Sequence, residues 1–226
     1  MVYVVGIDEA GRGAVIGPMV IAGVSIDKKK EKTLLKIGVK DSKKLTNKKR
    51  EELAKKIEEI ARDVVVLRVQ PCKIDNFRAK GLNLDKIEAI KMAELIELIN
   101  GDKFYIDSLE QNTNRFKNLI KEFLKNKKNT ELIVKNYLDE SVPVVSAASI
   151  IAKVERDRAI EEIKEKVNFD FGVGYPHDPR TLEFLKKILR EKKDFPPYVR
   201  KSWITAQNLI SESWQKKLKD FFQKIK

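Results

Sequence analysis

The chain has 226 residues, of which 42% are hydrophobic and 36% are charged, and its formal net charge is +13. This length suits one main domain with a small appendage, and no apolar run approaches the roughly 20 residues that a membrane span needs. The excess of lysine and arginine favours a polyanionic partner, nucleic acid first, although the lysine-rich surface of a heat-adapted protein would look similar.

Two residue types that occur only once limit the chemistry that the chain can carry out. Cys72 is the only cysteine, which rules out an internal disulfide and fits a reducing cytoplasm, and we expect it to be a small core residue. His177 is the only histidine, so a metal would be held by oxygen atoms, as Mg²⁺ and Mn²⁺ prefer. The chain enters a predicted strand at once, which leaves no room for a signal peptide.

The first predicted strand is the most informative segment. The apolar run 2–7 ends in two adjacent carboxylates, Asp8 and Glu9. Such a run predicts a strand buried on both faces, and in α/β sheets ligands collect beyond the carboxyl ends of the strands. Two acids there repel each other and lose hydration, which indicates a divalent cation; a solvated turn is the alternative.

A glycine-rich turn, 11–17, follows these acids and superficially resembles a dinucleotide-binding fingerprint. It leads into Pro18 and another apolar run rather than a helix, which argues against that interpretation. Gly11 and Gly13 are better suited to close approach to a sugar, with backbone amides offered to phosphate. Arg12 between them is either a substrate contact or a surface residue.

The remaining elements of the first part of the chain alternate between strands and helices, which fits an α/β fold. Apolar runs predict strands at 19–26, 64–69, 103–106 and 131–135. Helical spacing predicts helices over 44–62 with Thr46 as N-cap, 83–100 with Gly101 as C-cap, 116–124, and 146–167 with Ser146 as cap.

The composition changes after residue 167, where 168–179 is rich in glycine, proline and aromatic residues. We place a domain boundary there, which gives a main domain over 1–168 and a small helical domain over 169–226. Asp178 is expected to cap a short helix over 179–190. A final amphipathic helix is expected from about Thr205, with its lysines opposite an apolar stripe.

Two more acids follow predicted strands: Asp107 comes directly after 103–106, and Asp139 lies just beyond 131–135. One strand-end aspartate is more often a turn former than a ligand. Together with Asp8 and Glu9 they make four carboxylates, a set that suits two hard cations roughly 4 Å apart. Two cations at that distance stabilise the attacking and leaving oxygens in phosphodiester cleavage.

The motifs of the chain, taken in order, resemble those of type 2 ribonuclease H, or ribonuclease HII, in its archaeal form. They are Gly6-Ile7-Asp8-Glu9-Ala10-Gly11-Arg12-Gly13, Asp41-Ser42-Lys43-Lys44-Leu45, Tyr105-Ile106-Asp107, the run 144–157, and Gly174-Tyr175-Pro176. The resemblance implies a ribonuclease H-like fold, with a mixed five-stranded sheet of order 3-2-1-4-5. It also implies cleavage of the RNA strand of RNA/DNA hybrids and of duplex DNA at embedded ribonucleotides, leaving 5′-phosphate and 3′-hydroxyl ends.

The same resemblance assigns roles to individual residues. Asp8, Glu9, Asp107 and Asp139 resemble the metal-binding acids, with Glu140 as a neighbouring competitor for Asp139. The turn of Gly11, Arg12 and Gly13 resembles the element that senses the ribose 2′-hydroxyl. Tyr175 resembles the tyrosine that works with this turn. Lys43 resembles a phosphate contact. Lys153 and Arg156, one helical turn apart, either follow phosphates or face solvent.

The expected cofactors are two divalent ions, Mg²⁺ or Mn²⁺. The expected substrate is a hybrid or ribonucleotide-containing duplex, bound by a cytoplasmic monomer with no membrane association. One rival is another two-metal nuclease or transferase of the same fold, such as a resolvase or integrase domain; Tyr175 and the glycine turn argue against it. The other is a non-catalytic hybrid-binding protein, which would leave the four acids unexplained.

Overall fold

The computed structural model describes residues 1–39, 45–127, 129–192 and 194–225, without the side chains of 216–225. The chain divides into two compact units. The first comprises Met1–Arg12, Met19–Val69 and Leu82–Asp157, and the second comprises Gly13–Pro18, Gln70–Gly81 and Arg158–Lys226. The boundary predicted between residues 168 and 169 falls inside the second unit, which also takes in two short segments from early in the chain.

The first unit is built on a mixed five-stranded sheet. Its strands are β1 (Tyr3–Ala10), β2 (Met19–Asp27), β3 (Asp63–Val69), β4 (Lys103–Asp107) and β5 (Glu131–Lys135), in the order β3-β2-β1-β4-β5. β2 is antiparallel to both β1 and β3, whereas β4 is parallel to both β1 and β5. The predicted fold class and strand order are confirmed.

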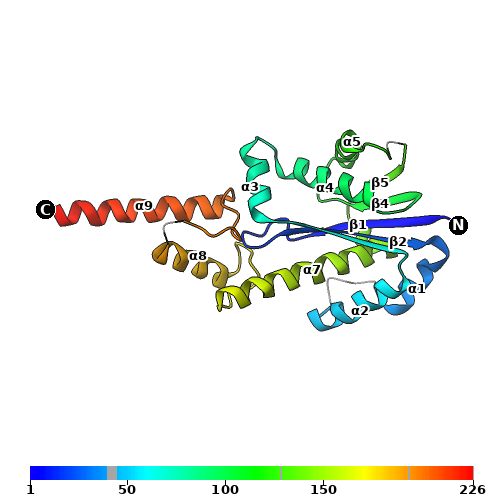
Figure 1. Ribbon diagram of the computed structural model, residues 1–226, viewed down its shortest axis with the longest axis horizontal. Helices are drawn as coiled ribbons and strands as arrows, with labels where there is room; N and C mark the ends of the chain where they lie inside the picture. The colour runs from blue at the N-terminus through cyan, green and yellow to red at the C-terminus, as the bar shows by residue number, and fades with distance from the viewer. Residues whose placement is uncertain (40–44, 128, 193, 226) are drawn as a thin grey trace. The chain divides into compact units, whose positions relative to one another are not determined.

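Helices cover both faces of this sheet (Figure 1). One face carries α4 (Leu84–Leu98) and α5 (Thr113–Phe123). The other carries α1 (Glu31–Ile37), α2 (Asn47–Ile60) and the first part of α7 (Pro143–Val167). The short helices η1 (Lys28–Lys30) and α6 (Leu138–Ser141) complete the unit. Burial on both faces explains why β1 and β2 are continuous apolar runs.

Alternation along β1 decides which face each side chain meets. A Cβ on Gly6 would collide with the Val144 carbonyl of α7, whereas Ile7 pairs with Gly23, where a Cβ would collide with Leu95 of α4. Even-numbered residues of β1 therefore face α7, and odd-numbered residues face α4. Asp8 and Glu9, although adjacent in sequence, leave the strand on opposite faces.

Helix ends agree with the sequence in part. Thr46 is the N-cap of α2, as predicted, and accepts a hydrogen bond from the Lys49 amide. The predicted C-cap role of Gly101 is wrong, because α4 ends at Leu98 with Ile99 as its C-cap. Gly101 is needed for close packing instead, since a Cβ there would collide with the Val5 side chain.

The start of α7 also differs from the prediction. The helix begins at Pro143, a residue favoured in a first turn, so Ser146 lies inside the helix rather than at its cap. The Ser146 hydroxyl donates to the carbonyl of Asp139, which fastens α6 to α7. This contact fixes the segment that carries one of the candidate acids.

The second unit contains α3 (Pro71–Ala79), the end of α7, α8 (Pro179–Glu191) and α9 (Ile204–Ile225). Its core includes Phe171, Phe184 and Leu185. Asp178 caps α8 as predicted, since its carboxylate accepts the Arg180 amide at 3.0 Å. Cys72 is exposed on α3, so its predicted core position is wrong. Across the described residues, no helix has the length and apolar character needed to cross a membrane.

Candidate metal centre

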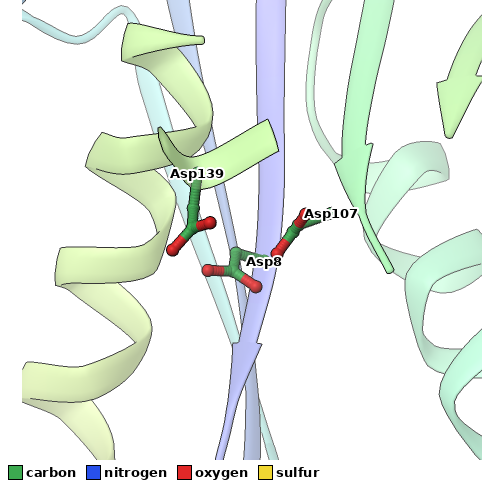
Figure 2. Close-up of side chains that lie close together, drawn as sticks. All are labelled: Asp8, Asp107 and Asp139. Carbon is green, nitrogen blue, oxygen red and sulfur yellow. The ribbon is translucent and has the colours of Figure 1, made fainter. Parts of the chain in front are cut away.

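Three aspartates of the first unit converge on one point, as Figure 2 shows. β1 and β4 are parallel neighbours with Ile7 opposite Ile106, so Asp8 and Asp107 follow at the same edge of the sheet. Asp139 is supplied by α6, just after β5. Each of the three offers a carboxylate oxygen, and these oxygens lie within 4.8 Å of one another.

The three carboxylates are removed from water, with Asp8, Asp107 and Asp139 only 6%, 8% and 5% exposed. Burial raises the pKa of the Asp8 carboxyl to about 7, and the charge of Asp107 adds to the shift. A hydrogen bond from the Ser149 side chain and the charge of Lys153 act in the opposite direction. The negative charge of Asp8 is therefore incompletely compensated by the protein.

These acids lie in a pocket of about 220 Å³. Lys153 lines the pocket, and its ammonium donates to the Ser149 hydroxyl at 2.8 Å. A buried set of carboxylate oxygens without histidine or cysteine is the donor set that hard divalent cations prefer. The residues present thus fit Mg²⁺ or Mn²⁺. Glu140, the sequence competitor of Asp139, is exposed.

Glu9 lines the same pocket, but among the described residues the converging oxygens belong to the three aspartates alone. It leaves β1 on the α4 face, where Glu88 is only 1% exposed. Burial raises the pKa of Glu9 well above its usual range, and the charges of Glu88 and Asp8 raise it further. Burial also raises the pKa of Glu88 to about 7, against the opposing charge of Arg12.

Arg12 lies against two carboxylates of α4. Its guanidinium forms an ion pair with Asp85, and its Nε lies 3.1 Å from Glu88 Oε2. The sequence left open whether Arg12 contacts substrate or is a surface residue; in the structure it is held within the first unit. Gly11 beside it has φ 79°, a left-handed conformation that favours glycine.

Gly13 and Tyr175 both belong to the second unit, and there they lie side by side. A Cβ on Gly13 would lie 3.8 Å from Cε1 of the Tyr175 ring. The amides of Val15 and Ile16 donate to the Gly174 carbonyl at 2.9 and 3.0 Å. The end of the glycine turn is therefore fastened to the loop that carries the tyrosine, and the substrate roles that the resemblance implied for them stay predictions.

The other predicted substrate contacts have different positions. Lys153 lines the acidic pocket. Arg156 is 6% exposed, with its guanidinium 3.6 Å from Asp157, so it does not face solvent, and its contact with a phosphate stays a prediction. Lys43 lies outside the described residues.

Sequence reasoning missed two residues around the site, Ser149 and Glu88. Sequence reasoning assigns no role to Ser149, which lies within the run 144–157, although its side chain hydrogen-bonds both Asp8 and Lys153. Its position four residues before Lys153, one helical turn away, is a signal that could have found it. Glu88 was not singled out, and a glutamate within an apolar helix stretch is a weak signal because most such residues are solvated.

Comparisons with known proteins identify the family of the chain. The family model of ribonuclease HII matches residues 5–206. A ribonuclease HII of Methanococcus maripaludis strain C7 is 47% identical over 227 residues, covering 99% of this chain and 92% of that protein.

Two solved structures extend the agreement to the fold. The ribonuclease H2 of Pyrococcus horikoshii OT3 matches with a TM-score of 0.86 and 44% identity, covering 93% of this chain and 98% of that one. The ribonuclease HII of Archaeoglobus fulgidus, solved as a complex with PCNA, matches with a TM-score of 0.82 and 43% identity. The match covers 91% of this chain and 96% of that one. The chain therefore belongs to the ribonuclease HII family and is a ribonuclease H, an endonuclease that acts on RNA/DNA hybrids.

Proposed function

We propose that this protein cleaves the RNA strand of hybrids, and duplex DNA at embedded ribonucleotides, with the help of two divalent cations. The products are 5′-phosphate and 3′-hydroxyl ends. The observation that carries the proposal is the convergence of Asp8, Asp107 and Asp139 in one pocket of a protein with a net charge of +13. A non-catalytic hybrid-binding protein has no use for buried acids, which repel the phosphates it must hold.

The three aspartates are proposed to hold the cations, with Glu9 completing the set from the opposite face of β1. Divalent cations bound there would stabilise the negative charge that develops on the phosphodiester in the transition state. Ser149 fixes the Asp8 carboxylate by a hydrogen bond. Lys153 supplies a positive charge on the pocket wall, where it partly offsets the acids and attracts the scissile phosphate.

Selection of ribose is proposed to belong to Tyr175 and the glycine turn. The Tyr175 ring is half-buried beside Gly13, the residue of the Gly11-Arg12-Gly13 turn that belongs to the second unit. The 2′-hydroxyl is the group that separates RNA from DNA, and a tyrosine hydroxyl can pair with it.

A cleavage assay tests this function directly. Three duplexes of one sequence are compared: an RNA/DNA hybrid, a DNA duplex with one ribonucleotide, and an all-DNA duplex. We expect Mg²⁺- or Mn²⁺-dependent cleavage of the first two and none of the third. Cleavage of the all-DNA duplex would favour another nuclease of this fold, and binding without cleavage of any duplex would favour the non-catalytic alternative.

We further propose that the protein acts as a cytoplasmic monomer that can bind PCNA. The A. fulgidus relative was solved in complex with PCNA. In this chain Trp214 is 59% exposed, and the sequence continues its spacing with Leu218 and Phe221, which gives an apolar stripe for a protein partner. Replacing Phe221 and Phe222 by alanine should abolish binding to PCNA in calorimetry while hybrid cleavage continues. Unchanged binding by the variant would refute this segment as the binding site, and a wild type that does not bind PCNA would refute the partner.

A further inference from the structure

Two exposed apolar side chains lie on the rim of the acidic pocket. Leu109 and Tyr137 both line it, and they are 62% and 67% exposed. Single exposed apolar residues are common on protein surfaces and need no explanation. Two of them on one pocket, which otherwise consists of acids, Lys153 and polar groups, form a feature with a defined location.

The side chain of Asn136 joins the two loops that carry this pair. Leu109 follows β4, and Tyr137 follows β5. The Asn136 amide group donates to the carbonyl of Ser108 and, at 3.1 Å, to that of Glu110. The residues on either side of Leu109 are thus tied to the residue before Tyr137, so the two apolar side chains are held on the same rim.

The backbone of Tyr137 is in a conformation that tyrosine rarely adopts. Its φ of 59° and ψ of 31° are left-handed, a region that glycine and asparagine adopt far more readily. The next amide, of Leu138, donates to Asp107 Oδ1 at 2.8 Å, so a candidate metal ligand helps to maintain this conformation. A large aromatic residue at a strained, exposed position beside a site is a pointer to function.

We propose that Tyr137, with Leu109 beside it, packs against the sugar of a nucleotide next to the scissile phosphate; this rests on the function proposed above. A pocket of about 220 Å³ is smaller than those that enclose whole ligands, which run from about 300 to 1,000 Å³. A phosphate can reach the acids, but the sugars attached to it must remain at the rim. In a duplex the bases are paired and stacked, so the sugar is the apolar surface available to an aromatic ring there.

The variants distinguish the effect of the Tyr137 ring from the effect of the left-handed backbone at this position. Tyr137→Gly removes the ring and suits the left-handed backbone, so a loss of folding does not confuse the result. Tyr137→Phe keeps the ring. Leu109→Ala tests the second rim residue, and Leu98→Ala is the matched control, because Leu98 is 63% exposed at the end of α4 and is not among the residues lining the pocket.

Binding is measured by fluorescence anisotropy in EDTA on a DNA duplex with one ribonucleotide, and kcat/KM is measured with Mg²⁺. Tyr137→Gly should weaken binding by about fivefold, which is the lower end of the loss for an aromatic ring stacked on a base. Leu109→Ala should weaken it less, while Tyr137→Phe and Leu98→Ala should bind like the wild type. Wild-type binding and cleavage by Tyr137→Gly would overturn the inference.

A second set of duplexes locates the contact. The nucleotide on one side or the other of the ribonucleotide is replaced by a three-carbon spacer, which removes its sugar and base. The difference between wild type and Tyr137→Gly should disappear for one of the two spacer duplexes; an equal difference on all duplexes would overturn the inference. A wild-type protein that cuts no duplex would instead refute the proposed function, so the two failures are distinguishable.

Discussion

Replacing Asp8 by asparagine should stabilise the metal-free protein while it abolishes cleavage. The pKa of Asp8 is raised from 3.8 to about 7 by burial and by Asp107. Between these two values the folded state binds more protons than the unfolded state, so the stability of the metal-free protein falls as the pH rises, and the loss is complete above about pH 7. Asparagine keeps the shape and the hydrogen bond from the Glu9 amide, but carries no charge.

The size of this stabilisation follows from the pKa shift of Asp8. About three pKa units at about 1.36 kcal/mol each give an upper limit of about 4 kcal/mol in the free energy of unfolding at pH 8. For a chain of this size that corresponds to a rise on the order of 10 °C in melting temperature. The gain should vanish below pH 3.8, where both states carry a protonated Asp8.

Thermal unfolding of wild type and Asp8→Asn in EDTA, followed by circular dichroism at pH 8 and pH 5, measures this difference. Adding Mg²⁺ should stabilise the wild type more than the variant, because only the wild type retains the full ligand set. Glu59→Gln, at an exposed position of α2, is the control and should not change the melting temperature. An Asp8→Asn protein less stable than wild type in EDTA at pH 8 would refute the claim that Asp8 is an undercompensated buried charge.

Three further predictions concern neighbouring residues. Asp139→Asn should lose most cleavage in the gel assay while Glu140→Gln retains it, and the reverse result would make Glu140 the ligand. Tyr175→Phe should lower kcat/KM at a single ribonucleotide roughly tenfold with little change in the dissociation constant, because it removes one hydroxyl contact; wild-type kinetics would leave Tyr175 a structural anchor. Arg12→Ala should lower the free energy of unfolding at pH 8 by about 3 kcal/mol in denaturant unfolding, because it leaves buried Glu88 without its ion pair. Adding Glu88→Gln should restore part of that loss. If Arg12 only binds phosphate, its replacement would change the affinity for the duplex instead.

The sheet and the converging acids could be predicted from sequence for a physical reason. Strands buried on both faces are continuous apolar runs, and parallel strands bring their carboxyl ends together. Asp8 and Asp107 follow directly from this rule, because each comes at the end of such a run. Asp139 does not, because its position depends on α6, a helix of four residues that starts after a left-handed tyrosine.

The missed features depend on contacts between segments distant in sequence. The ion pairs of Arg12 join the turn after β1 to α4 across more than seventy positions, and nothing in the local pattern of either segment indicates them. Gly101 looked like a helix cap because glycine often ends helices, but the Val5 side chain is what excludes a Cβ there. Strand alternation could have separated Glu9 from Asp8, since adjacent residues of a strand face opposite sides.

Metal binding by the three aspartates is the central claim. The most direct test is a titration of wild type and Asp107→Asn with Mn²⁺ by isothermal calorimetry, with hybrid cleavage followed in the same buffer. Wild type should bind two Mn²⁺ ions, and cleavage should rise with their occupancy. Asp107→Asn should lose at least one of these ions together with most of its cleavage. A variant that binds Mn²⁺ with wild-type stoichiometry and affinity, and still cuts the hybrid, would contradict the account.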